Sequence, residues 1–186
     1  AAAAYNEDVL YVCYDNEAYM NTGGQQSTAT LPGTKTTTTT TRGLAGARKK
    51  EIVEIMAAHR IPLAATASIG YPHDLLRKVE QARSLKGFKF IHLHTPCPTG
   101  WQLPPDEGVR SARMAVKARI HPLYHVLDGH TYVIDLDPEP IPVAEYWATQ
   151  GKRLLSLTDE EMDIIQRDVD RRWQTLLTRS RQGPAR

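Results

Sequence analysis

The stretch Val9-Leu10-Tyr11-Val12-Cys13-Tyr14-Asp15-Asn16 is apolar, β-branched and aromatic until its last two residues. This pattern predicts a buried strand that ends at a polar turn. Further along the chain, segments of strand character alternate with segments of helical periodicity. Such alternation is typical of right-handed βαβ units, so the sequence predicts an α/β fold with a mainly parallel sheet and helices on both faces.

The remaining elements are expected from local patterns. Asp128-Gly129 between two apolar runs favours a β-hairpin with a two-residue turn. Thr158 and Glu161 together predict a capping box, followed by a helix whose apolar stripe runs to about residue 178 and then by a basic tail. The other predicted elements are helices over residues 47–60, 74–85 and 106–119 and strands over residues 63–68 and 88–94.

In parallel α/β sheets, ligands bind beyond the carboxyl ends of the strands. This rule selects the segment after Tyr14 and the segment after His94. Asp15-Asn16 in the first segment offers oxygen ligands of the kind that Mg²⁺ prefers, while Gly23-Gly24 allows a close backbone approach. The alternative for the same residues is a polar turn that holds no ligand.

The composition is that of an ordinary globular domain, with 186 residues, 41% hydrophobic and 24% charged, and a formal net charge of +2. The balanced charge argues against nucleic acid as a partner, and no apolar run approaches the ~20 residues that span a bilayer. Two cysteines exclude a disulfide-stapled scaffold and a self-contained four-thiolate metal centre. Without a recognisable signal peptide we expect a cytoplasmic protein, and we interpret the opening run Ala1–Ala4 as a truncation scar or as unassigned residues.

Residues 25–46 lack apolar periodicity and contain the six-threonine run Thr36–Thr41. Such a segment is either a flexible low-complexity linker or a functional loop. The sequence pattern by itself leaves both interpretations open.

The string Tyr11-Val12-Cys13-Tyr14-Asp15-Asn16-Glu17-Ala18-Tyr19-Met20-Asn21-Thr22-Gly23 resembles the thiamine-diphosphate segment of the β subunit of pyruvate:ferredoxin oxidoreductase and related 2-oxoacid:ferredoxin oxidoreductases. The threonine-rich loop, Ala65-Thr66-Ala67-Ser68 and Pro96-Cys97-Pro98-Thr99-Gly100-Trp101 resemble the same family, and the resemblance covers roughly residues 8–150. It implies the thiamine-diphosphate-binding fold, of which the chain holds only a part. Residues 5–150 would form this domain without its N-terminal part, and residues 151–186 would form a helical extension and tail.

The resemblance implies roles for individual residues by position. Asn16 would give its side-chain oxygen to Mg²⁺ and Ala18 its backbone carbonyl, and the metal would bridge the cofactor diphosphate. Asn21 would be the catalytic residue beside the thiazolium and the substrate. Asp15 is expected to shape the turn rather than to ligate the metal. The implied cofactor-binding set is Asp15, Asn16, Ala18, Asn21, Thr22 and Gly23.

Cys97 stands between two prolines, which stiffen its loop. In the resembling family this position supplies one thiolate of a [4Fe–4S] cluster, and the other three come from the N-terminal part of the same subunit. The chain lacks those three cysteines, and it also lacks the Gly-Asp-Gly triplet that precedes Asp15 in the family and supplies a further Mg²⁺ ligand. Cys13, inside a strand, is interpreted as a small buried apolar residue. A zinc site that uses His92, His94 and Cys97 is the competing metal hypothesis.

The activity that the resemblance implies is oxidative decarboxylation of a 2-oxoacid, with pyruvate as the expected substrate. Thiamine diphosphate, Mg²⁺ and a [4Fe–4S] cluster would be the cofactors, coenzyme A would accept the acyl group, and ferredoxin or a similar carrier would accept the electrons. The chain would work in a hetero-oligomer with α-, γ- and δ-type subunits. Two alternatives stay open: a thiamine-diphosphate carboligase or decarboxylase without a cluster, and a non-catalytic structural fragment.

Overall fold

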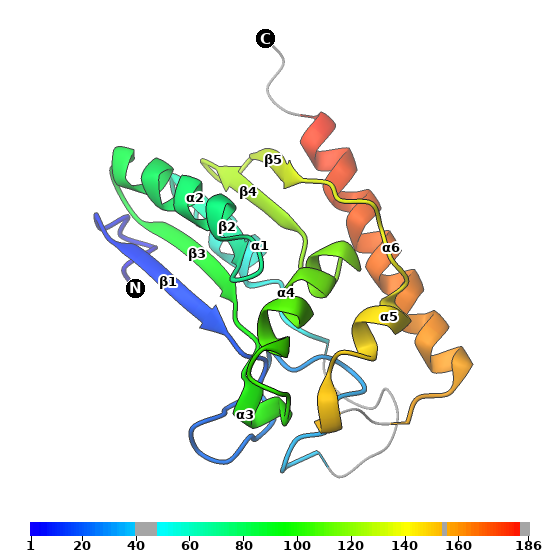
Figure 1. Ribbon diagram of the computed structural model, residues 1–186. Coiled ribbons are helices and arrows are strands. Elements are labelled where there is room, and N and C mark those ends of the chain that lie inside the picture. Colours follow the sequence, from blue (N-terminus) through cyan, green and yellow to red (C-terminus); the bar gives the residue numbers. More distant parts are fainter. Residues whose placement is uncertain (40–47, 154–155, 183–186) are drawn as a thin grey trace.

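A computed structural model describes residues 1–39, 48–153 and 156–182. These residues build a five-stranded sheet with the strand order β1-β3-β2-β4-β5 (Figure 1). β1, β3 and β2 are parallel, β4 is antiparallel to β2, and β5 is antiparallel to β4, so the expected mainly parallel sheet is confirmed. The strands are β1 (Leu10–Asp15), β2 (Leu63–Ser68), β3 (Lys89–His94), β4 (Leu123–Leu127) and β5 (Thr131–Leu136).

Helices cover both faces of the sheet, as expected. Figure 1 shows α2 in front of the sheet and α1 behind it, while α6 runs along β5. The shorter helices α3, α4 and α5 gather near the end of the sheet toward which β1 and β3 point. The helices are α1 (Ile52–Ala57), α2 (Pro72–Ser84), α3 (Pro98–Trp101), α4 (Glu107–Lys117), α5 (Val143–Trp147), the 3₁₀ helix η1 (Gly151–Arg153) and α6 (Asp159–Arg181).

The central strand β2 is buried along its whole length. Its small side chains let helices approach closely on both faces, because successive residues of a strand point to opposite sides. Ala64 packs in one cluster with Phe90 of β3 and Trp173 of α6. Ala65 packs in a second cluster with Ile91, on the face that α2 covers. The sheet is therefore packed on both faces and rigid, which fixes the positions of the loops at the ends of its strands.

Two local sequence signals are confirmed. Asp128 and Gly129 both have positive φ, and the His130 N–H donates to the Leu127 carbonyl, so the hairpin turn between β4 and β5 lies where the sequence predicted it. At the start of α6 the Glu161 N–H donates to the Thr158 hydroxyl, and the Thr158 N–H donates to the Glu161 carboxylate. The apolar stripe of this helix is buried through Ile165, Val169, Trp173 and Leu176.

The expectation of a buried first strand is wrong for most of β1. β1 pairs with β3 along one side and is the edge of the described sheet. Tyr11, Val12 and Tyr14 are 53%, 43% and 69% exposed, whereas Asp15 at the end of the strand is buried. An apolar run indicates a strand but does not reveal how many neighbouring strands it pairs with. The pattern therefore could not distinguish an edge strand from a central strand.

The helix expected over residues 47–60 is shorter in the structure. It begins at Ile52 and ends at Ala57, and Ala47 lies outside the described residues. The next helix begins at Pro72 rather than at Asp74, because proline fits the first helical turn, where its missing N–H leaves no bond unmade. Both differences concern only the ends of elements that the sequence placed correctly.

The described part of the threonine-rich loop folds back on the segment that follows β1. The Thr37 N–H donates to the Gly24 carbonyl, and the Thr38 hydroxyl accepts from the Gln26 N–H. Residues 40–47, which include Thr40 and Thr41, lie outside the described residues. These contacts favour the functional-loop interpretation over a linker for residues 25–39.

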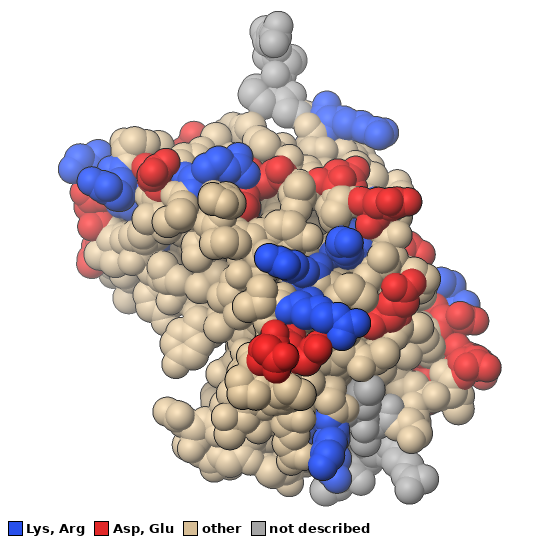
Figure 2. Space-filling model, in the orientation of Figure 1, with Lys and Arg blue, Asp and Glu red and all other residues tan. Residues whose placement is uncertain are grey.

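Charged side chains of both signs are interspersed on the face shown in Figure 2. This distribution agrees with the balanced composition of the chain. None of the helices in the described ranges combines the length and the apolar character needed to cross a bilayer.

Candidate functional site

The two segments selected by the sequence meet at the carboxyl ends of β1 and β3. Asp15 and His94 are partners in the parallel register, and the Thr95 N–H donates to the Asp15 carbonyl at 2.8 Å. One residue further, the Trp101 indole N–H donates to the Asn16 carbonyl at 3.1 Å. The loops after the two strands are thus tied together by hydrogen bonds.

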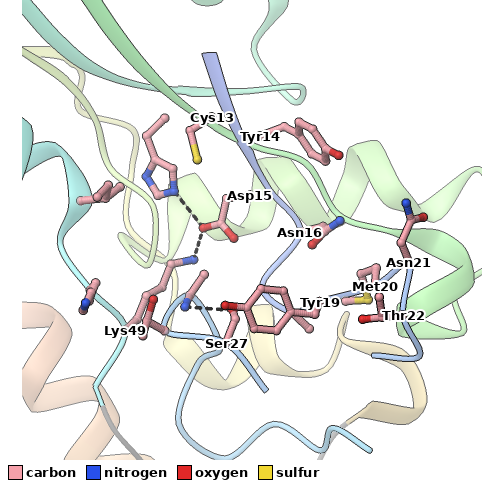
Figure 3. Close-up of a pocket in the computed structure, with 16 residues that line it drawn as sticks. Cys13, Tyr14, Asp15, Asn16, Tyr19, Met20, Asn21, Thr22, Ser27 and Lys49 are labelled. Atoms are coloured by element: carbon pink, nitrogen blue, oxygen red, sulfur yellow. Dashed lines mark hydrogen bonds and ion pairs between the residues drawn. The ribbon is translucent and has the colours of Figure 1, made fainter. Parts of the chain in front are cut away.

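A cavity of about 460 Å³ opens beyond the end of β1 (Figure 3). It is lined by residues 13–22 with the exception of Glu17, by residues 27–29, by Lys49, Lys50 and Ile52, and by His92. Gly23, with φ of +121°, makes the following turn, and neither Gly23 nor Cys97 belongs to the lining. The expected site residues that line the cavity are Asp15, Asn16, Ala18, Asn21 and Thr22.

Asp15 is buried and fully engaged by other groups of the protein. Its carboxylate accepts from the Glu17 N–H at 2.8 Å, lies 2.6 Å from Lys49 Nζ and lies 2.9 Å from His92 Nε2. Figure 3 shows the Asp15 side chain directed toward Lys49 and away from Asn21. Burial by itself raises the pKa of Asp15, but Lys49 and His92 outweigh it and hold this pKa well below its usual value. The Asp15 carboxylate is thus bound within the protein, and its expected turn-shaping role stays a prediction.

Glu17 forms the second half of the same buried charge cluster. It is 1% exposed, its Oε1 lies 3.2 Å from Lys49 Nζ, and its Oε2 pairs with Arg153. Burial raises the pKa of Glu17, yet Lys49 and Arg153 more than compensate and lower it. Burial likewise lowers the pKa of Lys49, while Asp15 and Glu17 raise it further than burial lowers it. These groups are therefore charged and mutually paired, which leaves none of them free to act as a base or nucleophile.

Three histidine rings pack against one another beside this cluster, His94 and His121 stacked and His92 edge-on to His121. His121 lies 5.3 Å from His92 and 5.0 Å from His94, measured between ring centroids. Burial, followed by the neighbouring His94 and His92, holds the pKa of His121 well below its usual value. Within the described residues no three His, Cys, Asp or Glu side chains form a group that could hold a metal, so the zinc hypothesis finds no support there.

Comparison with known proteins decides the family. Residues 1–93, half of the chain, match the family described as thiamine pyrophosphate enzyme, C-terminal TPP binding domain. The chain belongs to the thiamine pyrophosphate enzymes. The matched residues include β1, the loop of residues 16–29 that contributes most of the cavity lining (the cavity loop) and most of β3, and the expected thiamine-diphosphate-binding fold is confirmed.

Named relatives of this thiamine pyrophosphate domain confirm the resemblance to the β subunits. The chain is 42% identical over 174 residues to the ketoisovalerate oxidoreductase subunit VorB of Pyrococcus abyssi and 44% identical over 173 residues to the pyruvate synthase subunit PorB of Methanocaldococcus jannaschii. Each alignment covers 91% of this chain but only 56% and 57% of the relative. The chain therefore spans little more than half the length of these relatives.

A solved 2-oxoglutarate:ferredoxin oxidoreductase from Magnetococcus marinus aligns with 60% of this chain and 45% of its own. The sequence identity is 22% and the TM-score 0.47, which is too distant for a comparison of individual residues.

The thiamine pyrophosphate domain presents two oxygens that fit a hard cation. Asn16 and Ala18 both line the cavity, and neither the Asn16 side chain nor the Ala18 carbonyl engages in a hydrogen bond among the residues that the structure describes. Amide and carbonyl oxygens are ligands that Mg²⁺ accepts, usually together with carboxylate, water and phosphate oxygens. The residues present therefore fit Mg²⁺ as a partial ligand set.

Cys97 lies outside the cavity, at the start of α3. Its sulfur accepts from the Gly100 N–H at 3.3 Å, an interaction that suits a thiolate. A Cβ at Gly100 would clash with the Met20 sulfur, so the Cys97 loop packs tightly against the cavity loop. Cys13 is only partly buried on β1, and burial raises the pKa of its thiol. Cys97 thus lies next to the loop that lines the cavity, and its role as a cluster ligand stays a prediction.

Sequence reasoning missed the cations that organise the site. Lys49 begins the pattern Lys49-Lys50-Glu51, which is typical of a solvated face, and Arg153 lies far along the chain in a segment without a motif. Glu17 stands inside the string that resembles the family, but the resemblance implies no role for it. Only the folded chain brings Glu17, Lys49 and Arg153 into contact.

Proposed function

We propose that this chain is the cofactor-binding portion of the β subunit of a 2-oxoacid:ferredoxin oxidoreductase. The observation that carries the proposal is the pair of open oxygens, from Asn16 and Ala18, on a cavity beyond the parallel strand β1. The family match and the VorB and PorB relatives support the same reading.

Different residues of the cavity loop would hold different parts of the cofactor. Thiamine diphosphate, when bound, supplies the electron sink that lets carbon dioxide leave a 2-oxoacid. Asn16 and Ala18 would hold the Mg²⁺ that neutralises its diphosphate, and Thr22 and Gly23 would border it. Asn21 would orient the reacting end by hydrogen bonding from its amide. Asp15 would act by fixing the turn, since its carboxylate is already bound within the protein.

Cys97 would connect this cavity to electron transfer. Its thiolate would be one ligand of a [4Fe–4S] cluster whose other ligands lie outside this chain, and the tight contact between the Cys97 loop and the cavity loop would keep the cluster close to the cofactor. Electrons would leave to ferredoxin or a similar carrier, and coenzyme A would take the acyl group. The α-, γ- and δ-type subunits would complete the complex, in the cytoplasm.

The substrate class is better supported than the substrate. The names of the relatives mention pyruvate synthase and ketoisovalerate oxidoreductase, at nearly equal identity to this chain. Both substrates are 2-oxoacids that differ in the side chain. We propose pyruvate as the substrate, in keeping with the PorB relatives.

The Asn16 assignment is tested in the full-length subunit within its complex. Asn16→Ala removes one of the two oxygens and is expected to weaken Mg²⁺-dependent thiamine diphosphate binding by about 10-fold or more, since each lost charge-assisted contact costs ~1.5–3 kcal/mol. Isothermal titration calorimetry with the stripped complex measures the affinity.

The matched control is Gln174→Ala, which removes an exposed amide on α6 and is expected to leave the affinity unchanged. Equal cofactor affinities for Asn16→Ala and the wild type would falsify the assignment.

A further inference from the structure

Glu17 stands between two residues that line the cavity, but its own side chain does not line it. We propose that Glu17 is a positioning residue. Its buried pairing with Lys49 and Arg153 keeps the oxygens of its neighbours, Asn16 and Ala18, directed toward the cavity. The inference rests on the proposed function, because it concerns the two oxygens assigned there to Mg²⁺.

The backbone of Glu17 is held in an unusual conformation. Its φ of +66° lies in the left-handed region, which residues with a Cβ rarely occupy. The Glu17 N–H donates to Asp15 Oδ1 at 2.8 Å, and the Glu17 carbonyl accepts from the Thr30 hydroxyl at 2.7 Å. Asn16 and Ala18 line the cavity while the residue between them does not. The conformation therefore turns the two flanking residues to one side and the carboxylate to the other.

Two cations from distant parts of the chain fix the carboxylate. Lys49 follows the threonine-rich loop, and Arg153 ends η1, yet both reach Glu17 inside the protein. The side chains of Glu17, Lys49 and Arg153 are 1%, 11% and 6% exposed. A buried carboxylate is tolerated only when it is paired, so these contacts fix the place of the Glu17 side chain and, with it, the strained backbone.

Trp101 closes a ring of contacts around Asn16. The Arg153 guanidinium lies 3.6 Å from the centroid of the Trp101 ring, and the Trp101 N–H donates to the Asn16 carbonyl at 3.1 Å. The Arg153 Nε also donates to the Gln150 side chain at 3.0 Å. The path from Glu17 through Arg153 and Trp101 thus returns to Asn16, the residue beside Glu17, so a movement of Glu17 or Arg153 would reach Asn16.

The test uses the full-length subunit in its complex, stripped of metal and titrated with Mg²⁺ at saturating thiamine diphosphate. Glu17→Gln preserves the shape of the side chain and removes its charge. We expect the apparent Kd for Mg²⁺, measured by calorimetry, to rise about 10–100-fold, as for other residues that orient metal ligands. At saturating Mg²⁺ the kcat is expected to return close to the wild-type value, because Glu17 does not line the cavity.

A second variant keeps the proposal testable if Glu17→Gln does not assemble. Trp101→Phe retains the ring beneath Arg153 and removes only the N–H that binds the Asn16 carbonyl, so a smaller rise in the Kd for Mg²⁺ is expected. Glu139→Gln, on an exposed loop, is the matched control and should change nothing.

The outcomes separate the two proposals. If Asn16→Ala weakens Mg²⁺ binding while Glu17→Gln, or Trp101→Phe where Glu17→Gln does not assemble, leaves it unchanged, the positioning role is overturned and the proposed function stands. If Asn16→Ala also leaves Mg²⁺ binding unchanged, the proposed function falls, and the positioning role falls with it.

Discussion

Residues at this site are of two kinds: charged side chains that are paired within the protein, and residues that line the cavity with polar groups free of hydrogen bonds in the described part of the chain. The two kinds have different roles. Asp15, Glu17 and Lys49 satisfy one another inside the protein. Asn16 and Ala18 line the cavity, and the Asn16 side chain and the Ala18 carbonyl make no hydrogen bond within the described residues. Loss of one partner from a buried ion pair typically costs ~3–5 kcal/mol, because the remaining charge is left without compensation. The paired residues therefore make the loop rigid, and the open ones remain available to a ligand.

The pairing predicts how stability depends on pH. In the folded chain the pKa values of Asp15 and Glu17 lie below those of the unfolded chain, which are about 4. The folded state therefore binds fewer protons in this range, so the stabilisation is complete above about pH 4 and is lost as the pH falls toward the folded values. Thermal unfolding of the full-length subunit, followed from about pH 7 to about pH 3, measures this loss.

The comparison variant for this prediction is Asp15→Asn, which is expected to unfold at lower temperature near neutral pH and to show a smaller further decline on acidification. Glu139→Gln, at an exposed position, should follow the wild-type curve. A wild-type curve that is flat across the acid range would contradict the prediction.

At the scale of elements, short-range signals placed every strand and most helices. The hairpin, the capping box and the α6 stripe depend on neighbours within a few residues, and all three are confirmed. The burial of β1 depends on what lies at its outer edge, which no local pattern contains. The limits of α1 and α2 shift by a few residues, because the ends of helices are the least fixed part of a local pattern.

The capping box at the start of α6 predicts a measurable contribution to stability. Thr158→Ala removes the hydroxyl that accepts from the Glu161 N–H and is expected to cost about 1 kcal/mol. Thr175→Ala, at an exposed position within the same helix, should be neutral or slightly stabilising, because alanine is the better helix former. Chemical denaturation compares the two variants. Equal stabilities would show that the box contributes nothing.

At the scale of the whole molecule, the site is assembled from remote segments. The carboxylates come from the end of β1, Lys49 from the segment after the loop, His92 from β3 and Arg153 from η1. The expected extension after residue 150 therefore contributes a buried partner to the site, and its helix α6 packs into the same core cluster as β3. The boundary at residue 150 remains a prediction.

In the proposed function, Cys97 would connect the chain to the rest of the complex. Cys97→Ser in the assembled enzyme is expected to diminish the electron paramagnetic resonance signal of the reduced clusters and the iron content, because serine oxygen is a poor replacement for a thiolate ligand. Cys13→Ser is the matched control, since Cys13 lies on β1, packed partly against the core, and should leave iron unchanged. An intact signal with full iron content in Cys97→Ser would overturn the assignment of Cys97 as a cluster ligand.

The sequence by itself determined the strand–helix order, the family and the loop that lines the cavity, because each of these depends on residues that are close together along the chain. The resemblance pointed to Asn16, Ala18 and Cys97, and their roles remain proposals. Only the tertiary structure brought Lys49 and Arg153 to Glu17, since pairing across 32 and 136 residues leaves no local pattern. Burial makes those pairings obligatory, because a charge removed from water needs a partner wherever the fold can supply one.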